Sequence, residues 1–185
     1  GRGGEALAFL PPGAAEVLLR ELAAGRIADG VLVERAILAR LRQMTEEEFA
    51  AYDGGGEGLY HRVYDTVRRC ATVEELLAAV KTKRYTAARL RRMVLSAWLG
   101  LSKAPETVPY ARVLAANETG RALLRQMRKT GAPVLTKAAD VAALGSGAEA
   151  LFRREAGYTD LYTLAYTDLA QAVPGSDWRL TPVMK

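Results

Sequence analysis

The feature that most constrains the fold of this sequence is a series of short amphipathic segments, each bounded by a helix-terminating or helix-capping residue. Between residues 12 and 100, apolar side chains recur at the spacing of an α-helix, and Thr, Pro or Gly stands where a segment begins or ends. The pattern predicts helices over about 13–24, 31–44 and 57–70, and others after the capping residues Thr45, Thr72 and Thr86.

The pattern changes after Pro105. Residues 110–115 and 134–135 read as short strands, and residues 118–129 between them read as an amphipathic helix. Strands joined through a helix are expected to pair in parallel. A last helix is predicted over about 147–164, and the end, 171–185, is expected to be extended.

The expected fold class is therefore mainly α, with one small parallel strand–helix–strand unit. We expect a helical domain over 9–104 and a C-terminal domain over 105–185 that contains this unit, the last helix and the tail. Residues 1–8 read as linker or vector-derived residues, because the chain opens Gly-Arg-Gly-Gly without a Met.

Composition excludes several classes of protein. The 185 residues include one Cys and one His, so an intrachain disulfide and a four-ligand Cys/His zinc site are both impossible. No apolar run is long enough for a membrane-spanning helix. We therefore expect a cytoplasmic fragment with no membrane partner.

Signals for catalysis are weak throughout the chain. His61 has no evident partner, Cys70 reads as a half-buried inert thiol, and Gly54-Gly55-Gly56 lacks the Lys of a phosphate loop. No His-x-x-His pair exists. The candidate carboxylates show no spacing typical of a metal or acid/base pair; they are Asp140, Glu149, Asp160 and Asp168. We assign no catalytic or metal-binding residue.

The distribution of charge gives the stronger signal. The net charge is +5, and no acidic residue stands between Glu75 and Glu106 or between Glu118 and Asp140. Basic residues fill both intervals, which predicts a surface that binds a polyanion. The candidate nucleic-acid-binding residues are Lys81, Lys83, Arg84, Tyr85, Thr86, Arg89, Arg92, Arg121, Arg125 and Arg128.

Residues 81–86 form the most distinctive part of this set. They join two predicted helices, so a phosphate there would meet Lys and Arg side chains together with the backbone N–H groups of the second helix. A solvated basic turn in which Thr86 is an ordinary cap explains the same residues. Tyr85 could stack on a base or pack inward.

Aromatic residues near the C-terminus also allow two interpretations. Tyr158 and Tyr162 lie one helical turn apart, either in the core or on a stacking surface. Trp178 is more often a lid on the core than a platform for bases.

Five stretches carry a resemblance to one family. They are Glu57-Gly58-Leu59, Lys81-Thr82-Lys83-Arg84-Tyr85-Thr86 with its Arg-rich continuation, Pro133-Val134-Leu135-Thr136-Lys137, Thr159-Asp160-Leu161-Tyr162 and Asp177-Trp178-Arg179-Leu180-Thr181-Pro182-Val183. Their order and spacing, from about residue 9 to the end, resemble the C-terminal half of the bacterial tRNA(Met) cytidine acetate ligases.

The resemblance implies a parent enzyme that activates acetate with ATP and Mg²⁺ and acetylates N4 of the wobble cytidine of elongator tRNA(Met). It also implies that an N-terminal nucleotidyltransferase domain is missing here, that this chain alone is inactive and holds no cofactor, and that it binds tRNA. An alternative is a structural domain that completes the ATP or acetyl-adenylate site at a domain junction. A third, weaker possibility is an independent RNA- or DNA-binding protein.

Overall fold

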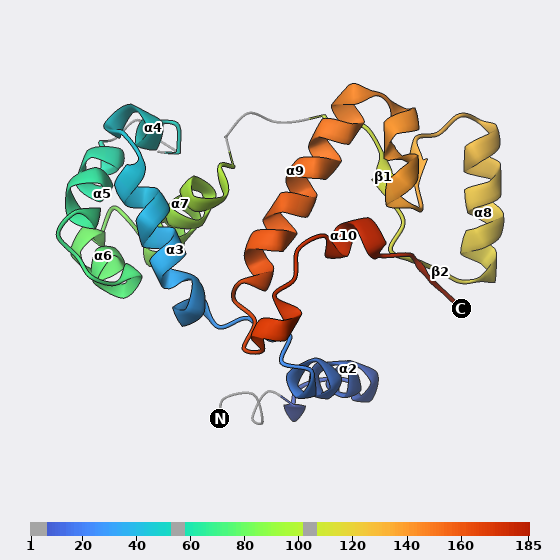
Figure 1. Ribbon diagram of the computed structural model, residues 1–185, viewed down its shortest axis with the longest axis horizontal. Coiled ribbons are helices and arrows are strands. Elements are labelled where there is room, and N and C mark those ends of the chain that lie inside the picture. Colours follow the sequence, from blue (N-terminus) through green and yellow to red (C-terminus); the bar gives the residue numbers. More distant parts are fainter. Residues whose placement is uncertain (1–6, 53–57, 102–106) are drawn as a thin grey trace. The chain divides into compact units, whose positions relative to one another are not determined.

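The chain is described by a computed structural model that places residues 7–52, 58–101 and 107–185. It divides into two compact units, drawn in Figure 1. Residues 1–28 and 106–185 form unit 1, and residues 29–105 form unit 2. This division differs from the predicted one in its first boundary, because residues 9–28 group with the C-terminal part of the chain rather than with the helices that follow them.

Unit 2 consists of short helices packed around one apolar core. They are α3 (Gly30–Gln43), α4 (Glu46–Ala50), α5 (Leu59–Val67), α6 (Val73–Val80) and α7 (Ala87–Leu99). Their inward faces contribute the fully buried Leu41, Phe49, Val67, Leu76 and Leu90. The predicted helical periodicity is confirmed here, because buried residues recur every three or four positions within a helix, as Val33, Ile37 and Leu41 do in α3.

The predicted helix caps of unit 2 are confirmed. Thr45 and Glu48 form a reciprocal capping box at α4. Thr72 accepts a hydrogen bond from the backbone N–H of Glu75, and Thr86 accepts one from that of Arg89. Gly100 ends α7 with a φ of +71°, a conformation that an L side chain rarely adopts.

Unit 1 combines helices with two small parallel strand pairs. Its helices are α2 (Pro12–Ala23), α8 (Glu118–Lys129), α9 (Ser146–Thr163) and α10 (Ser176–Arg179), with 3₁₀ helices η1 (Ala138–Leu144) and η2 (Leu169–Gln171). Strand β1 (Ala111–Arg112) pairs with β3 (Val134–Leu135), and β2 (Ala115–Ala116) pairs with β4 (Val183–Met184). The expectation of a mainly α fold with a small parallel unit is therefore confirmed.

Two details of the prediction for unit 1 are wrong. The strand expected over 110–115 is split, since β1 pairs with β3 while β2 pairs with the end of the chain. The segment 171–185 is not extended throughout, because η2 ends at Gln171 and Ser176–Arg179 forms α10, which lies against α9 in Figure 1. We call residues 171–185 the tail.

The core of unit 1 lies between α9, η1 and the first strand pair. Phe152 is buried at its centre, with Tyr110, Leu135, Val141 and Ala156 in the same cluster. Trp178 of α10 packs edge-on against Phe152, with ring centroids 4.7 Å apart. Trp178 is therefore a lid on this core, as the more frequent of the two interpretations predicted.

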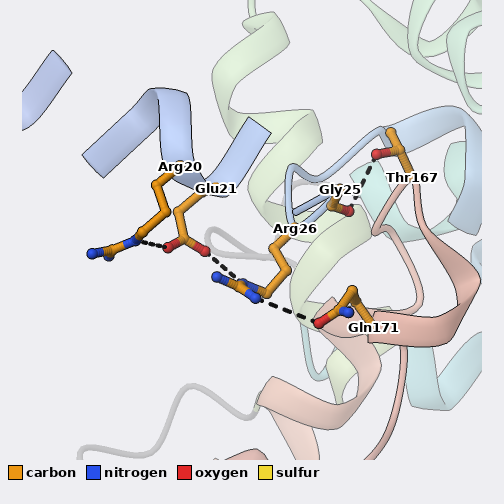
Figure 2. Close-up of polar contacts among 6 residues, drawn as sticks. All are labelled: Arg20, Glu21, Gly25, Arg26, Thr167 and Gln171. Atoms are coloured by element: carbon orange, nitrogen blue, oxygen red, sulfur yellow. Dashed lines mark hydrogen bonds and ion pairs between the residues drawn. The ribbon is translucent and has the colours of Figure 1, made fainter. Parts of the chain in front are cut away.

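Helix α2 follows its predicted bounds, but its apolar stripe is not buried. None of its residues is buried, and Val17, Leu19 and Leu22 are exposed. Polar contacts hold the segment after it instead (Figure 2): the Thr167 hydroxyl donates to the Gly25 carbonyl, and Arg26 donates to the Gln171 side chain. These contacts explain why residues up to 28 belong to unit 1.

The same segment leaves no room for a side chain at Gly25. Its φ is +65°, and a Cβ there would lie 2.4 Å from the Cβ of Asp168. Next to it, Glu21 lies between Arg26 and Arg20, as Figure 2 shows, and these guanidinium groups lower the pKa of the Glu21 carboxyl to about 2.

Candidate nucleic-acid interface

A basic hollow in unit 1 brings together three of the candidate residues predicted from the sequence. Arg121, Arg125 and Arg128 stand on one face of α8, at positions i, i+4 and i+7. They line a hollow of about 330 Å³. Its described lining also contains Lys137 and no carboxylate; the rest of that lining is Leu124, Thr136, Thr181, Pro182 and Met184. We call it the basic hollow.

The basic hollow is walled by three segments that are distant in the sequence. Helix α8 supplies the arginines, the turn after β3 supplies Thr136 and Lys137, and the tail supplies Thr181, Pro182 and Met184. The Arg128 guanidinium donates to the Thr136 hydroxyl at 2.6 Å, which fixes its orientation. Arg121 lies 3.6 Å from Glu118, whose side chain is almost wholly exposed, so that pair neutralises little of its charge.

The tail is held against unit 1 by backbone and side-chain contacts. The N–H groups of Val183 and Lys185 donate to the carbonyls of Leu114 and Ala116, which pairs β4 with β2. Asp177, whose side chain is 8% exposed, accepts from Arg112 at 2.6 Å. The tail wall of the basic hollow is therefore part of the folded unit and not a loose terminus.

The residues of that wall are not among the candidate residues predicted from the sequence. Two of the stretches that carried the resemblance, 133–137 and 177–183, contribute Thr136, Lys137, Thr181 and Pro182 to the lining. The signal was thus present in the sequence, but the pairing of the tail with β2 that brings these residues to α8 is not local and cannot be read from periodicity.

The second group of candidate residues lies in unit 2, on the turn between α6 and α7 and on α7 itself. Lys81, Lys83, Arg84 and Arg92 are exposed, and Arg89 is half-buried. Tyr85 is 6% exposed, and the guanidinium carbon of Arg89 lies 5.4 Å from its ring centroid. Of the two interpretations of Tyr85, inward packing therefore holds in this structure. Thr86 is exposed and caps α7.

Residues considered for catalysis have structural roles where the structure describes them. The Cys70 thiol donates to the Thr66 carbonyl, and burial raises the pKa of this thiol, which makes it a poor nucleophile. His61 is exposed and contacts the Glu46 carboxylate. Gly54-Gly55-Gly56 lies outside the described residues.

The four candidate carboxylates do not come together. Asp140 is exposed and Glu149 pairs with Arg153. Asp160 accepts from the N–H of Gly175, and Asp168 from that of Ala170. In the ranges 7–52, 58–101 and 107–185, no three His, Cys, Asp or Glu side chains are grouped so that they could hold a metal ion. Within the same ranges, no helix is both long enough and apolar enough to span a membrane.

A partly buried pair of polar side chains, Tyr110 and Glu155, lies near the Arg112–Asp177 contact of the tail. The Tyr110 hydroxyl donates to Glu155 at 2.7 Å. Burial and the Glu155 carboxylate raise the pKa of Tyr110 above its ordinary value of 10.0. No buried side-chain nitrogen or oxygen in the described part of the chain lacks a hydrogen-bond partner. We therefore assign this pair a structural role.

The raised pKa of Tyr110 has a consequence for stability at alkaline pH. Because the folded protein favours the neutral phenol, the contribution of Tyr110 to the free energy of unfolding is fully present below about pH 10. This contribution decreases as pH rises above that value. We expect the wild-type chain to lose more stability between pH 8 and about pH 10.5 than the Tyr110→Phe variant. Urea unfolding at both pH values measures the difference. Equal losses would show that Tyr110 does not titrate differently on unfolding.

Comparison with known proteins identifies the family. The sequence profile of the family described as HIGH Nucleotidyl Transferase matches residues 4–175, nearly the whole chain. The chain belongs to this family. The expectation that it is a half without the nucleotidyltransferase domain is wrong, because the family profile matches this chain itself. The missing N-terminal domain predicted as its partner is likewise unsupported.

Individual proteins that resemble this chain can be compared with it directly. A protein of Thermoanaerobacter sp. (strain X514) named tRNA(Met) cytidine acetate ligase is 33% identical over 134 residues, which are 70% of this chain and 32% of that protein. Crystal structures of Thermotoga maritima TmcAL share the fold: the apo form has a TM-score of 0.84 at 23% identity, and covers 95% of this chain and 45% of its own.

A second Thermotoga maritima structure, bound with alpha-thio ATP, has a TM-score of 0.82 at 24% identity and covers 95% of this chain and 46% of its own. The chain thus spans less than half the length of these relatives.

Proposed function

We propose that this chain belongs to a tRNA-modifying acetate ligase and binds tRNA through the basic hollow. The observation that carries the proposal is the lining of the hollow, in which Arg121, Arg125, Arg128 and Lys137 stand together without a carboxylate. A concave site whose lining has several cations and no carboxylate suits the phosphates of RNA. The name of the relatives, tRNA(Met) cytidine acetate ligase, supports tRNA as the RNA concerned.

The basic residues on the turn between α6 and α7, which we call the unit 2 group, support the same proposal. Lys81, Lys83 and Arg84 are exposed, as a surface that contacts RNA phosphates requires. Burial of this group would have favoured the alternative role, completion of an ATP or acetyl-adenylate site. We therefore propose that both groups contact tRNA, with elongator tRNA(Met) as substrate and N4 of its wobble cytidine as the acetylated atom.

The proposed reaction needs ATP, which supplies the energy for activating acetate, and Mg²⁺. Binding of alpha-thio ATP by the Thermotoga maritima relative supports ATP as co-substrate. Among the described residues, no three His, Cys, Asp or Glu side chains are grouped so that they could hold Mg²⁺ without a nucleotide. We assign no step of acetate activation to residues of this chain.

Replacing Arg125 and Arg128 together by Gln is expected to weaken tRNA binding about tenfold or more at low salt. The salt dependence should flatten by about one unit of slope for each phosphate that the variant no longer neutralises. The measurement is fluorescence anisotropy with elongator tRNA(Met), a second tRNA and a double-stranded DNA at three salt concentrations. The Lys83→Ala/Arg84→Ala variant tests the unit 2 group in the same assay.

A charge-matched control separates the hollow from general electrostatics. Arg20→Gln with Arg153→Gln removes two exposed guanidinium groups of unit 1 that do not line the hollow. This control should keep most of the affinity and the salt slope. An equal loss in the control and the Arg125/Arg128 variant would contradict a specific site, and no tRNA binding by the wild-type chain at low salt would contradict the proposed function.

A further inference from the structure

The basic hollow has an apolar part that phosphate binding does not explain. Leu124 lies on α8 between two of the arginines, and Pro182 and Met184 come from the tail. Leu124 and Pro182 are half-buried, while the Met184 side chain is largely open, at 47% exposure. A site for phosphate alone gains nothing from such surface, since phosphate oxygens are satisfied by charge and hydrogen bonds.

The shape of the site favours one form of RNA over another. In an A-form duplex the bases are stacked inside, so a protein meets mainly phosphates and 2′-hydroxyls. Apolar side chains in a hollow can contact the face of a base only when that base has left the stack. A volume of about 330 Å³ is at the lower end of the range for small-ligand sites, about 300–1,000 Å³, and so suits one nucleotide rather than several.

We infer that the basic hollow holds one unpaired nucleotide of the bound RNA. Its phosphate lies against the guanidinium groups of Arg121, Arg125 and Arg128, and its base packs against Leu124, Pro182 and Met184. This inference rests on the proposed function and goes beyond it, because it names the class of RNA element that the site recognises: a loop, bulge or single-stranded end rather than a paired stem.

Hydroxyl groups in the hollow complete its fit to a nucleotide. The Thr136 hydroxyl accepts from Arg128, so its own hydrogen is available to donate to an oxygen of the ligand. Thr181 contributes a second hydroxyl to the lining from the tail. These groups can form hydrogen bonds with a 2′-hydroxyl or a base edge. A purely cationic surface recognises the charge of the phosphates and neither of these groups.

The walls that would contact the base are fixed before binding. Strand β4 carries Met184 and is paired with β2 in register, Ala116 opposite Met184. Asp177 and Arg112 anchor the segment that precedes Pro182. A preformed wall loses little conformational entropy when a ligand binds, which favours recognition of a flexible, unpaired nucleotide.

The test compares an unstructured oligoribonucleotide with the same strand annealed to its complement. Met184→Ala should weaken binding of the single strand about fivefold and leave duplex binding unchanged, because only an unpaired base reaches the side chain. Val183→Ala is the matched control, since Val183 is the neighbour of Met184 in β4 and does not line this hollow. Met184→Leu should retain most of the wild-type affinity.

The outcomes separate this inference from the function on which it rests. If the wild-type chain binds tRNA but Met184→Ala changes single-strand and duplex binding equally or not at all, the inference is overturned and the proposed function stands. If free ATP binds in the hollow and the oligoribonucleotide does not, the hollow is a site for a free nucleotide, and the inference is also overturned. If no RNA binds at low salt, the proposed function itself fails.

Discussion

Replacing Phe152 by Ala is expected to lower the free energy of unfolding of unit 1 by about 3–5 kcal/mol, because it opens a cavity in a closed core. The Phe152 side chain is 1% exposed. On one side it contacts the edge of Trp178, and on another the guanidinium carbon of Arg112 lies 5.1 Å from its ring centroid. Neither neighbour can move into the space without leaving its own packing position.

Urea unfolding, followed by fluorescence, measures this loss. The chain has two tryptophans, Trp98 in unit 2 and Trp178 in unit 1, so a Trp98→Phe background makes Trp178 the reporter. Leu169→Ala is the control in the same unit, because Leu169 is 82% exposed and its truncation should change stability by less than about 0.5 kcal/mol. A Phe152→Ala loss as small as that of the control would show that Phe152 does not anchor the core.

What the sequence predicted well was local. Helices α3 and α9 begin and end near the expected residues, and α6 and α7 begin directly after the predicted caps Thr72 and Thr86, because capping side chains and apolar periodicity act within a few residues of each other. The parallel pairing of β1 with β3 also followed from a local argument, since a helix of the length of α8 returns the chain in the same direction.

What the sequence did not predict depends on distant contacts. The division of residues 110–115 into β1 and β2 is decided by two different partners, β3 and the tail strand β4. The predicted helix over 13–24 has an apolar stripe that nothing buries in α2, and the contacts that hold the segment after it are polar: Gly25 and Arg26 bond to Thr167 and Gln171. Periodicity reports that a face is apolar and does not report what, if anything, covers it.

The candidate site shows the same limit. The spacing of Arg121, Arg125 and Arg128 placed them on one face of a helix, and α8 has that face. The tail could not be assigned to the site from the sequence, because two contacts between distant parts of the chain bring it there: the pairing of β4 with β2, and the ion pair of Arg112 with Asp177. Neither residue stands out in composition.

The second large effect is expected at this ion pair. Asp177→Asn should destabilise unit 1 by about 2–3 kcal/mol, because it leaves the Arg112 guanidinium, 24% exposed, without its counter-charge in a partly buried place. The value lies below that for a wholly buried pair, since water still reaches Arg112, and the Asp177 carbonyl also accepts from it at 3.3 Å. Urea unfolding in the Trp98→Phe background measures it.

A double-mutant cycle distinguishes the ion pair from simple loss of packing. Arg112→Met removes the charge and keeps an apolar stem against Phe152. If the pair is the cause, Asp177→Asn should cost much less in the Arg112→Met background than in the wild type, with a coupling of about 1–2 kcal/mol. Additive losses would contradict the assigned role.

Hydrogen exchange links this pair to the basic hollow. The N–H groups of Val183 and Lys185 are bonded to β2 and its neighbour Leu114, so their exchange reports whether the tail wall is in place. If Arg112 and Asp177 hold the tail, Asp177→Asn should raise the exchange rate at both amides while leaving amides of unit 2 unchanged.

Because Thr181, Pro182 and Met184 line the hollow from the tail, the same variant should weaken binding of single-stranded RNA more than binding of duplex RNA. Faster exchange at β4 without any change in single-strand binding would separate the anchoring of the tail from recognition of the nucleotide.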